Sequence, residues 1–284
     1  MTTRRITVKK TGRAGNLLPV ITLLTDFGTA DYFVGAVKGA ILSINPTAVI
    51  ADITHEIPPQ DLEAAAFTLL ASYATFPPGT IHVVVVDPGV GSTRRPVIVS
   101  AGGQFFVGPD NGIFTYIYDR EPSFQTFHVT AEKYFRQPTS TTFHGRDIFA
   151  PVAAALSNGV KPKVFGPAIT DAVRFDSPLM PVAHENGRIE GRIIHIDRFG
   201  NCITNITRDL LQDQPATLLV KEKEINTFSD FYSDASPNDL FGIWGSAGFL
   251  EIAVNRGSAA LTLGVKRGEA VVFTQRRKGG RGAK

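Results

Sequence analysis

The sequence predicts an α/β fold in two domains: an N-terminal domain on a mostly parallel sheet, followed by a smaller C-terminal all-β barrel. Three observations support this fold. Up to about residue 160, apolar runs typical of buried strands alternate with segments of helical spacing. Beyond residue 178, short strand-like runs alternate with Gly and Asn turns, and no long helical pattern occurs. The length of 284 residues is comfortable for two domains.

The N-terminal half begins with alternating strands and helices. The four valines of 83–86 are typical of a strand that is buried on both faces, as in a parallel sheet. A helix that connects two strands of one sheet forms a right-handed crossover, and the two strands are then parallel. The expected elements are, in order, a strand over 20–24, a helix over 32–44, a strand over 48–53, a helix over 61–76 and a strand over 81–86.

The next segment is expected to pair locally. Gly102 and Gly103 separate two apolar runs, which predicts a β-hairpin. Asn158 and Gly159 are typical of a helix C-terminus and predict the end of the last helix of this half. The expected elements here are strands over 97–100 and 104–107, a turn over 109–112, a short helix near 113–118, and a helix over 148–156 that residues 142–147 open.

The sequence pattern changes over 177–181, which contain two prolines, and this predicts the linker between the domains. The second domain is expected to be a small barrel or sandwich. Its expected strands lie over 187–197, 216–221, 248–254 and 270–274. We therefore divide the chain into a basic tail over 1–18, an α/β domain over 19–177, a β-barrel domain over 178–273 and a basic tail over 274–284.

The basic charge is confined to the two ends of the chain. The sequence has 29 Lys and Arg against 26 Asp and Glu, but residues 1–18 and 274–284 each hold five bases and no acid. Without these ten bases, 19 remain against 26 acids, which gives the body a net charge of −7. The tails are expected to be solvated and disordered. We do not expect nucleic-acid binding, because no recognition motif accompanies them.

Composition excludes several other classes of protein. Cys202 is the single cysteine, which excludes an internal disulfide and a multi-cysteine zinc site. No run approaches the ~20 apolar residues of a membrane helix, and the first residues lead into no secretory signal. No histidine lies at ligand spacing from another, and no phosphate-binding glycine motif occurs. We therefore expect a cytoplasmic protein without a metal or cofactor.

Two acidic residues follow strands whose ends meet at one edge of the predicted sheet. Asp26 ends the first strand and Asp87 the third, and open α/β sheets bind ligands at this edge. Asp26 either grips paired hydroxyls, as a ribose offers, or serves as a turn or cap residue. Asp87 precedes a Pro-Gly turn that folds Arg94 back toward it, which predicts an ion pair. A plain strand-end turn is the alternative for Asp87.

His144 lies at the start of the last helix predicted in this half. A helix N-terminus lowers the pKa of a histidine because it disfavours the imidazolium. A neutral imidazole can act as a base or orient a water molecule. A structural or partly exposed histidine is the alternative.

The second domain holds weaker candidates around glycines. Asp197 and Asn201 flank one glycine, and they form either a hairpin turn or a clamp for a zwitterion. In the clamp, Asp197 meets an ammonium and Asn201 donates to a carboxylate. Ser246, Asn255 and Arg256 lie in two further glycine-containing segments that are suited to holding a flat base.

Six motifs in order connect these candidates with a known family. The sequence resembles the S-adenosyl-L-methionine (SAM) hydrolases, also called SAM hydroxide adenosyltransferases, which are relatives of the fluorinase and chlorinase. The resemblance covers nearly the whole chain except the basic tails. The motifs that carry it are TDFGTADYFVGAVKGAI from Thr25, VDPGVGSTRR, GPDNG, TFHGRDIFAP, DRFGN, and EIAVNRGSAA ending at Ala260.

The resemblance implies that SAM and water react to give adenosine and L-methionine, without a cofactor. It also implies a homotrimer, with the substrate between the N-domain of one subunit and the C-domain of its neighbour. The implied catalytic triad is Asp87, Arg94 and His144. We expect Asp87 and His144 to orient the water and accept its proton, and Arg94 to stabilise the hydroxide. The implied binding residues are Asp26 for ribose, Asp197 and Asn201 for methionine with Phe228 packing nearby, and Asn255 and Arg256 for adenine.

Two alternatives remain open. The resemblance places Asp87 where the fluorinase has a tyrosine, Gly145 where it has a halide-binding serine, and Gln60 where it has a tryptophan. A SAM-dependent halogenase that makes 5′-halo-5′-deoxyadenosine is therefore disfavoured. The other alternative is a protein that binds SAM or adenosine without turnover, and the complete triad argues against it.

Overall fold

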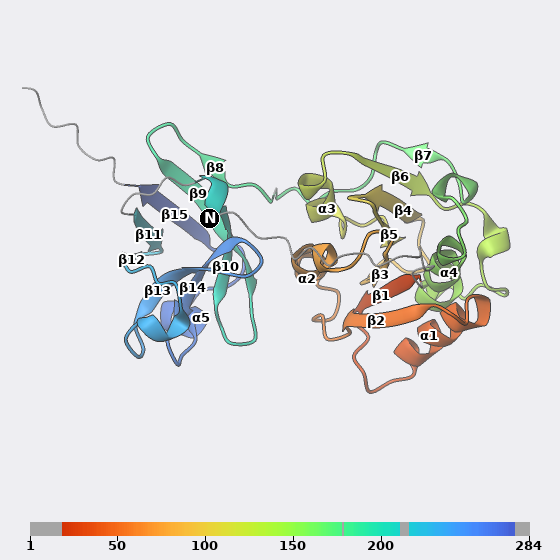
Figure 1. Ribbon diagram of the computed structural model, residues 1–284, viewed down its shortest axis with the longest axis horizontal. Coiled ribbons are helices and arrows are strands. Elements are labelled where there is room, and N and C mark those ends of the chain that lie inside the picture. The colour runs from red at the N-terminus through yellow and green to blue at the C-terminus, as the bar shows by residue number, and fades with distance from the viewer. Residues whose placement is uncertain (1–18, 178, 211–215, 276–284) are drawn as a thin grey trace, which may run out of the picture.

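The computed structural model describes residues 19–177, 179–210 and 216–275, which form one sheet of 7 strands and one of 8 (Figure 1). Of the predicted tails over 1–18 and 274–284, residues 1–18 and 276–284 lie outside the described residues. The last strand, β15 (Ala270–Gln275), contains the first two residues of the second predicted tail. Within the described ranges, no helix combines the length and the apolar character that a membrane crossing requires.

The predicted succession of strand, helix, strand, helix and strand is confirmed. Its elements are β1 (Val20–Thr25), α1 (Phe33–Ile44), β2 (Val49–Thr54), α2 (Leu62–Ser72) and β3 (Ile81–Val85). β1 pairs in parallel with β2 on one side and with β3 on the other. α2 begins where the side chain of Asp61 accepts a hydrogen bond from the N–H of Ala64 at 3.0 Å, which satisfies one free donor of the first turn.

The whole N-terminal sheet is mixed, so the expected mostly parallel sheet is not confirmed. Its order is β2-β1-β3-β5-β4-β6-β7, with three parallel pairs followed by three antiparallel pairs. The cause is local: Gly102 and Gly103 have φ angles of 57° and 75° and form the predicted hairpin, whose strands are necessarily antiparallel. The additional strands are β4 (Pro96–Ala101), β5 (Gln104–Pro109), β6 (Phe124–His128) and β7 (Ala168–Ile169).

Helices cover both faces of this sheet. α1 and α4 (Ala150–Ser157) pack on one face, and α2 and α3 (Thr115–Arg120) pack on the other. A π-helical turn, Gly145–Phe149, leads directly into α4, so the last helical segment begins earlier than predicted. The chain leaves β1 for β2 over one face and returns to β3 over the other. The carboxyl ends of β1 and β3 therefore lie side by side at the point where ligands bind in open α/β sheets.

The C-terminal sheet is antiparallel and barrel-like, as predicted. Its order is β12-β11-β15-β9-β10-β14-β13, and β8 pairs with β9. At the open end, the N–H of Gly242 in β13 donates to the carbonyl of Thr227 at 2.9 Å, and the N–H of Ser229 donates to the carbonyl of Gly242 at 3.0 Å. The segment after β12 therefore bonds to β13 and nearly closes the barrel.

The predicted strands of this half are present, and four more accompany them. The strands are β8 (Val182–Ala183), β9 (Arg188–Ile196), β10 (Cys202–Thr207), β11 (Ala216–Val220), β12 (Lys223–Ile225), β13 (Leu240–Trp244), β14 (Phe249–Val254) and β15. One short helix, α5 (Ala259–Leu263), means that the domain is not purely β. The Ser258 side chain caps this helix by accepting from the N–H of Leu261.

The two halves meet at α2. The ring of Phe67 in α2 stacks on His195 of β9, with centroids 4.6 Å apart. Arg267 of the barrel donates to Asp61 at 2.7 Å and lies 3.2 Å from Glu63, both at the N-terminus of α2. An apolar stack and a pair of ionic contacts therefore connect the halves directly beside the first turn of α2.

Candidate active site

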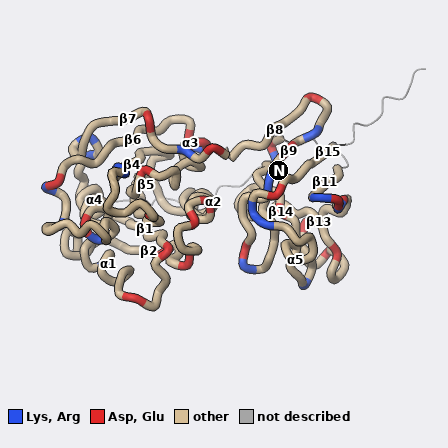
Figure 2. Tube along the Cα trace, turned by 180° about the vertical axis from the view of Figure 1, so that it is seen from behind, with Lys and Arg blue, Asp and Glu red and all other residues tan. Residues whose placement is uncertain are grey.

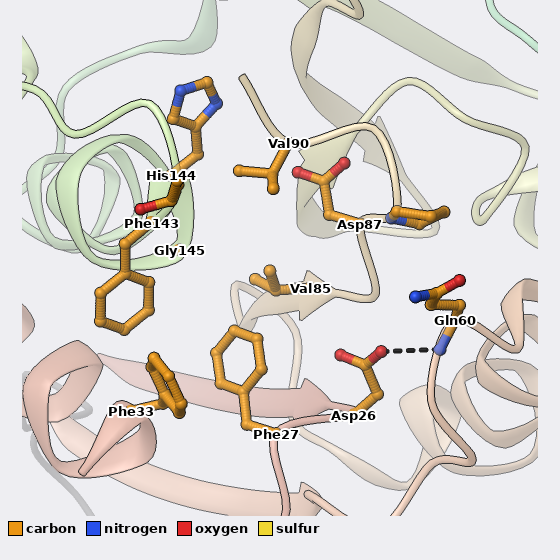
Figure 3. Close-up of a pocket in the computed structure, with 12 residues that line it drawn as sticks. Asp26, Phe27, Phe33, Gln60, Val85, Asp87, Val90, Phe143, His144 and Gly145 are labelled. Atoms are coloured by element: carbon orange, nitrogen blue, oxygen red, sulfur yellow. Dashed lines mark hydrogen bonds between the residues drawn. The ribbon is translucent and has the colours of Figure 1, made fainter. Parts of the chain in front are cut away.

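A cavity of about 420 Å³ lies where β1 and β3 end (Figure 3). Its polar residues come from four separate segments, and its remaining lining is mostly apolar. The lining residues are Asp26, Phe27, Phe33, Gln60, Val85, Asp87, Pro88, Val90, Thr142, Phe143, His144 and Gly145. The fold thus brings predicted site residues from both strand ends and from the segment before α4 to one place.

Asp87 and Arg94 form the predicted ion pair. Nε of Arg94 donates to Oδ1 of Asp87 at 2.9 Å and to Oδ2 at 3.0 Å, and Nη2 also donates to Oδ2. The side chains of Asp87 and Arg94 are 5% and 9% exposed. Charge-assisted bonds of this bidentate kind are geometrically specific, and the low dielectric around buried groups strengthens them.

The same guanidinium reaches His144. Nη2 of Arg94 lies 2.6 Å from Nδ1 of His144. A guanidinium can only donate, so Nδ1 accepts and the neutral ring carries its proton on Nε2. The pKa of His144 is lowered, first by burial and then by the positive charge of Arg94. The pKa of His144 is therefore lowered, as expected, but burial and the charge of Arg94 cause the change and a helix N-terminus does not.

Arg94 contacts two residues of the cavity wall without lining the cavity itself. Its Nη1 is buried and has no hydrogen-bond partner among the described residues. The guanidinium carbon lies 5.3 Å from the ring centroid of Phe149, which covers it. A buried donor without a partner costs about 1–3 kcal/mol.

Gly91 lets the segments that carry Arg94 and His144 approach each other. Its φ is 79°, and a Cβ built there would lie 2.3 Å from the carbonyl oxygen of Thr141. The turn between Asp87 and Arg94 therefore rests against the backbone that leads to His144. A residue with a side chain would meet both the left-handed conformation and this contact.

A buried carboxylate organises the segment that carries His144. Asp147 has no exposed surface. It accepts hydrogen bonds from the N–H of Ser140 at 2.9 Å and from Nε of Arg146 at 2.6 Å. The guanidinium of Arg146 lies 5.0 Å from the ring centroid of Phe143. These contacts fix the residues on both sides of His144.

Asp26 faces the cavity from the end of β1 (Figure 3). Its Oδ2 accepts a hydrogen bond from the backbone N–H of Gln60 at 2.8 Å. Gln60 has a φ of 65°, which is unusual for a residue with a side chain. Directly before Asp26, Oγ1 of Thr25 lies 2.8 Å from Nδ1 of the buried His55. Asp26 is thus held at a fixed position, and its Oδ1 makes no hydrogen bond to another described residue.

Three phenylalanines form the apolar wall of the cavity. The ring of Phe27 lies 5.7 Å from that of Phe33 and 5.9 Å from that of Phe143, and the rings of Phe33 and Phe143 are 5.2 Å apart. Tilted and edge-to-face contacts of this kind are the favoured aromatic arrangements. They keep one side of the cavity free of polar groups.

A second cavity, of about 810 Å³, lies on the C-terminal barrel. Within the part of the chain that the structure describes, no residue lines both cavities, so a single chain does not bring the two groups of predicted site residues together. The predicted residues that line the second cavity are Asp197, Asn201, Ser246, Asn255 and Arg256.

Asp197 and Asn201 are bonded to each other. The backbone N–H and the Nδ2 of Asn201 both donate to the Asp197 carboxylate at 2.9 Å, as does the N–H of Phe199. Asn255 donates from Nδ2 to the carbonyl of Ala235 at 2.7 Å. The acid and both amides therefore have a structural role in the turns at this cavity, in addition to lining it.

Phe228 does not line this cavity. It lies in the segment that closes the barrel, and its ring packs against Phe273 with centroids 5.9 Å apart. The residues that the sequence analysis missed include a buried acid, Glu251, which lines the cavity and is 8% exposed. The available signal was one charged residue in the apolar strand FLEIAV. The missed aromatic residues of the lining are Phe199, Phe231, Tyr232 and Trp244.

Charged residues of both signs are interspersed along the described trace, without a long basic run (Figure 2). Among the described residues, no three His, Cys, Asp or Glu side chains are grouped so that they could hold a metal ion.

The fold and cavities define a two-domain class: a mixed α/β domain joined to a small β-barrel. Residues 21–166 match the family model of the SAM hydroxide adenosyltransferase N-terminal domain, and residues 191–272 match that of the C-terminal domain. The chain belongs to the SAM hydroxide adenosyltransferase family.

Individual relatives agree with this placement. An (R)-S-adenosyl-L-methionine hydrolase from Salinispora arenicola is 37% identical over 262 residues, which are 90% of this chain and 98% of that protein. The crystal structure of an uncharacterized conserved protein from Thermotoga maritima is similar with a TM-score of 0.83 at 36% identity, over 90% of this chain and 100% of that one. A fluorinase from an Actinoplanes species is 27% identical over 292 residues, with coverage of 90% and 98%.

Proposed function

We propose that this protein hydrolyses (R)-S-adenosyl-L-methionine to adenosine and L-methionine. The observation that carries the proposal is the buried series of contacts from Asp87 through Arg94 to His144, beside a small and largely apolar cavity. Relatives with the name (R)-S-adenosyl-L-methionine hydrolase support the same reaction. No bound cofactor is needed for it.

The reaction is a displacement at C5′ of the ribose. A bond forms between the water oxygen and C5′, the bond between C5′ and sulfur breaks, and its electron pair leaves with the sulfur of methionine. The sulfonium becomes a neutral thioether, so its departure requires no general acid. The difficult partner is water, because it is a weak nucleophile. The protein therefore has to hold one water molecule in line with the sulfur and remove its proton.

From their contacts we infer different tasks for the acid and the imidazole. Nδ1 of His144 already accepts from Arg94, and its Nε2 carries a proton. His144 therefore orients the water by donation, and the carboxylate of Asp87 accepts the proton. The positive charge of Arg94, beside both groups, stabilises the developing hydroxide electrostatically. This differs from the expectation that Asp87 and His144 both accept the proton.

The apolar wall favours this step. Attack by a hydroxide-like oxygen on a sulfonium neutralises charge in the transition state, and charge neutralisation is more favourable where the dielectric is low. Phe27, Phe33 and Phe143 provide such surroundings. Positioning of the water adds to the effect and contributes up to ~7–11 kcal/mol in well-aligned reactions.

We further propose that the complete site forms between chains of a homotrimer. Asp26 and the triad would act on ribose and C5′, and the barrel cavity of a neighbour would hold methionine and adenine. The separation of the two cavities within one chain supports this arrangement. Aromatic residues suited to contact with a neighbour are exposed: Tyr32 by 68%, Phe231 by 66% and Phe199 by 78%. We also propose that the second domain begins at residue 178 and that the protein is cytoplasmic.

Product analysis tests the reaction. Purified protein is incubated with SAM in halide-free buffer and in buffers with chloride or fluoride, and nucleosides are identified by chromatography and mass spectrometry. We expect adenosine and L-methionine in every buffer and no 5′-halonucleoside. A halonucleoside would establish the halogenase alternative, and SAM that is bound but intact would establish the binding protein.

Variants and mass measurements test the roles and the assembly. Asp87→Asn, Arg94→Ala and His144→Ala are each expected to lower kcat by about 10²-fold or more while the circular dichroism spectrum stays unchanged. Wild-type turnover in all three would contradict the triad. Light scattering is expected to give three times the chain mass, and a monomer with full activity would contradict the intersubunit site.

A further inference from the structure

The turn that carries Asp26 is tied to the segment that follows β2. The N–H of Gly28 donates to the carbonyl of His55 at 2.8 Å. The N–H of Ile57 donates to the carbonyl of Thr25 at 3.4 Å. His55 is 4% exposed, and Thr25, which directly precedes Asp26, is also buried. The position of the Asp26 carboxylate therefore depends on how these two segments are joined.

A bond between two side chains joins the segments from within. Oγ1 of Thr25 lies 2.8 Å from Nδ1 of His55, and it also accepts a hydrogen bond from the N–H of Phe27 at 3.3 Å. The hydroxyl proton needs an acceptor, because a buried donor without a partner is costly. Among the described residues, Nδ1 of His55 is the acceptor that this hydroxyl reaches, so the neutral ring carries its proton on Nε2. Thr25 thereby connects the imidazole with the backbone on both sides of Asp26.

The other nitrogen of the ring faces an ion pair. Nε2 of His55 lies 3.1 Å from Oδ1 of Asp52, within ion-pair distance but without the alignment of a hydrogen bond. Oδ2 of Asp52 accepts a hydrogen bond from Nζ of Lys38 in α1 at 2.6 Å. A carboxylate beside Nε2 favours the proton on this nitrogen, which leaves Nδ1 free to accept from Thr25. The contacts thus form one series from Lys38 through Asp52 and His55 to Thr25.

We propose that His55, through Thr25, is a positioning residue for the carboxylate of Asp26, and that it thereby sets the preference of the site for ribose over deoxyribose. This inference rests on the proposed function, which supplies a ribose at this end of the cavity. The diol of a ribose has two donors, and a carboxylate accepts from both only where its oxygens face them. His55 does not line the cavity, so it acts on the ribose only through the turn.

The test measures how strongly the protein prefers a sugar with hydroxyl groups. Calorimetry gives the affinities of adenosine and of 2′,3′-dideoxyadenosine for the full chain and its variants, and their ratio reports the contribution of the two hydroxyls. We expect the wild type to bind adenosine about tenfold or more tightly, because hydrogen bonds to a charged group are strong. Thr25→Val and His55→Leu should each lower this ratio by about fivefold and leave the affinity for dideoxyadenosine nearly unchanged.

The chain offers a matched control on the same strand. Oγ1 of Thr22 lies 2.7 Å from Nδ1 of His82, and this pair is buried within the sheet. Thr22→Val removes the same kind of bond and is expected to keep the wild-type ratio. Thr25→Ser, which retains the hydroxyl, is also expected to keep it. In an Asp26→Ala background the diol has lost its acceptor, so Thr25→Val should have no further effect on the ratio.

Results of two kinds would overturn the inference. If Thr25→Val and His55→Leu keep the wild-type ratio, or weaken the binding of both nucleosides equally, His55 only stabilises the fold. Should these variants fail to fold, Asp52→Asn, on the outer side of the ring, must lower the ratio, because an amide no longer favours the proton on Nε2.

The second kind of result concerns the wild type. If it releases adenosine from SAM but binds adenosine and dideoxyadenosine equally, the inference is wrong and the hydrolysis stands. If it releases no adenosine, the proposed hydrolysis is wrong, and the nucleoside ratio still decides the role of His55 because binding requires no turnover.

Discussion

The guanidinium of Arg94 lies 2.6 Å from Nδ1 of His144, and the same nitrogen, Nη2, donates to Asp87. One planar group therefore connects the acid at the end of β3 with the imidazole before α4. The connection fixes the tautomer of His144, because only a ring nitrogen without a proton can accept from it. The three residues are thus best treated as one unit, and their individual substitutions are not expected to be additive.

Arg94→Lys tests the need for the planar guanidinium. A lysine keeps the charge but presents a single nitrogen, which cannot reproduce the paired contacts to Asp87 and His144. We expect kcat for adenosine release to fall by about 10²-fold with little change in KM, since the residue does not line the cavity. Arg174→Lys, which alters a surface pair with Asp119, is the control. Retention of full activity by Arg94→Lys would show that charge alone suffices.

Gly91→Ala tests the contact between the segments that carry Arg94 and His144. The added methyl group would meet the carbonyl of Thr141 at 2.3 Å and displace the turn that carries Arg94. Gly103→Ala is a matched control: its φ of 75° is close to the 79° of Gly91, but nothing lies within 4 Å of its added Cβ. Both variants should lose about 1 kcal/mol of stability from the left-handed backbone. Only Gly91→Ala is expected to lose activity, by about tenfold or more, in assays of adenosine release beside thermal unfolding.

The N-terminal site was predictable because its residues follow strongly patterned elements. The valine run predicts β3, and the ends of parallel strands meet at a common edge, which places Asp26 and Asp87 together. The tautomer of His144 was not predictable, because it depends on a contact between residues 50 positions apart. Only the predicted hairpin of the antiparallel half was foreseen, and β6 and β7 were missed because they carry little periodicity of their own.

The barrel was less predictable, because tertiary contacts override its local pattern. β10 contains Thr204 and Asn205, which are polar and yet almost fully buried. Thr204 donates to the carbonyl of Leu250 at 2.7 Å, and Asn205 accepts from the N–H of Arg192 at 2.7 Å. In the sequence, such polar residues are typical of a turn. They can lie in a buried strand only because these hydrogen bonds satisfy their side chains. Glu251 was missed for the same reason: nothing in its neighbours along the chain reveals that its carboxylate faces a cavity.

The fall of kcat at acidic pH is expected to follow the protonation of His144. Its pKa is lowered, first by burial and then by Arg94, so the ring stays neutral to a pH below its ordinary value. As the pH falls through this lowered pKa, the ring takes up a proton, loses the bond from Arg94 and repels it. We therefore expect kcat to be level around pH 7 and to fall at acidic pH. In an NMR titration, Arg94→Met should raise the pKa of His144, and an unchanged or lower value would contradict this account.

His82 is expected to make the stability of the fold depend on pH. It is a fully buried residue of β3, with Nδ1 2.7 Å from Oγ1 of Thr22 and Nε2 2.9 Å from Oε1 of Gln104. Burial lowers its pKa from 6.5 to about 4. Between these values the unfolded chain binds the proton and the folded chain does not, so stability falls as the pH drops from 6.5 to about 4.

The expected loss over that interval is about 3 kcal/mol, from 1.36 kcal/mol for each pH unit. Urea unfolding at a series of pH values measures it. His82→Gln should be less stable at neutral pH, because it leaves the pair with Thr22 or Gln104 incomplete, but its stability should depend less on pH over this interval. His184→Gln, at an exposed position, should keep the wild-type slope. Equal slopes for the wild type and His82→Gln would mean that other groups cause the acid sensitivity.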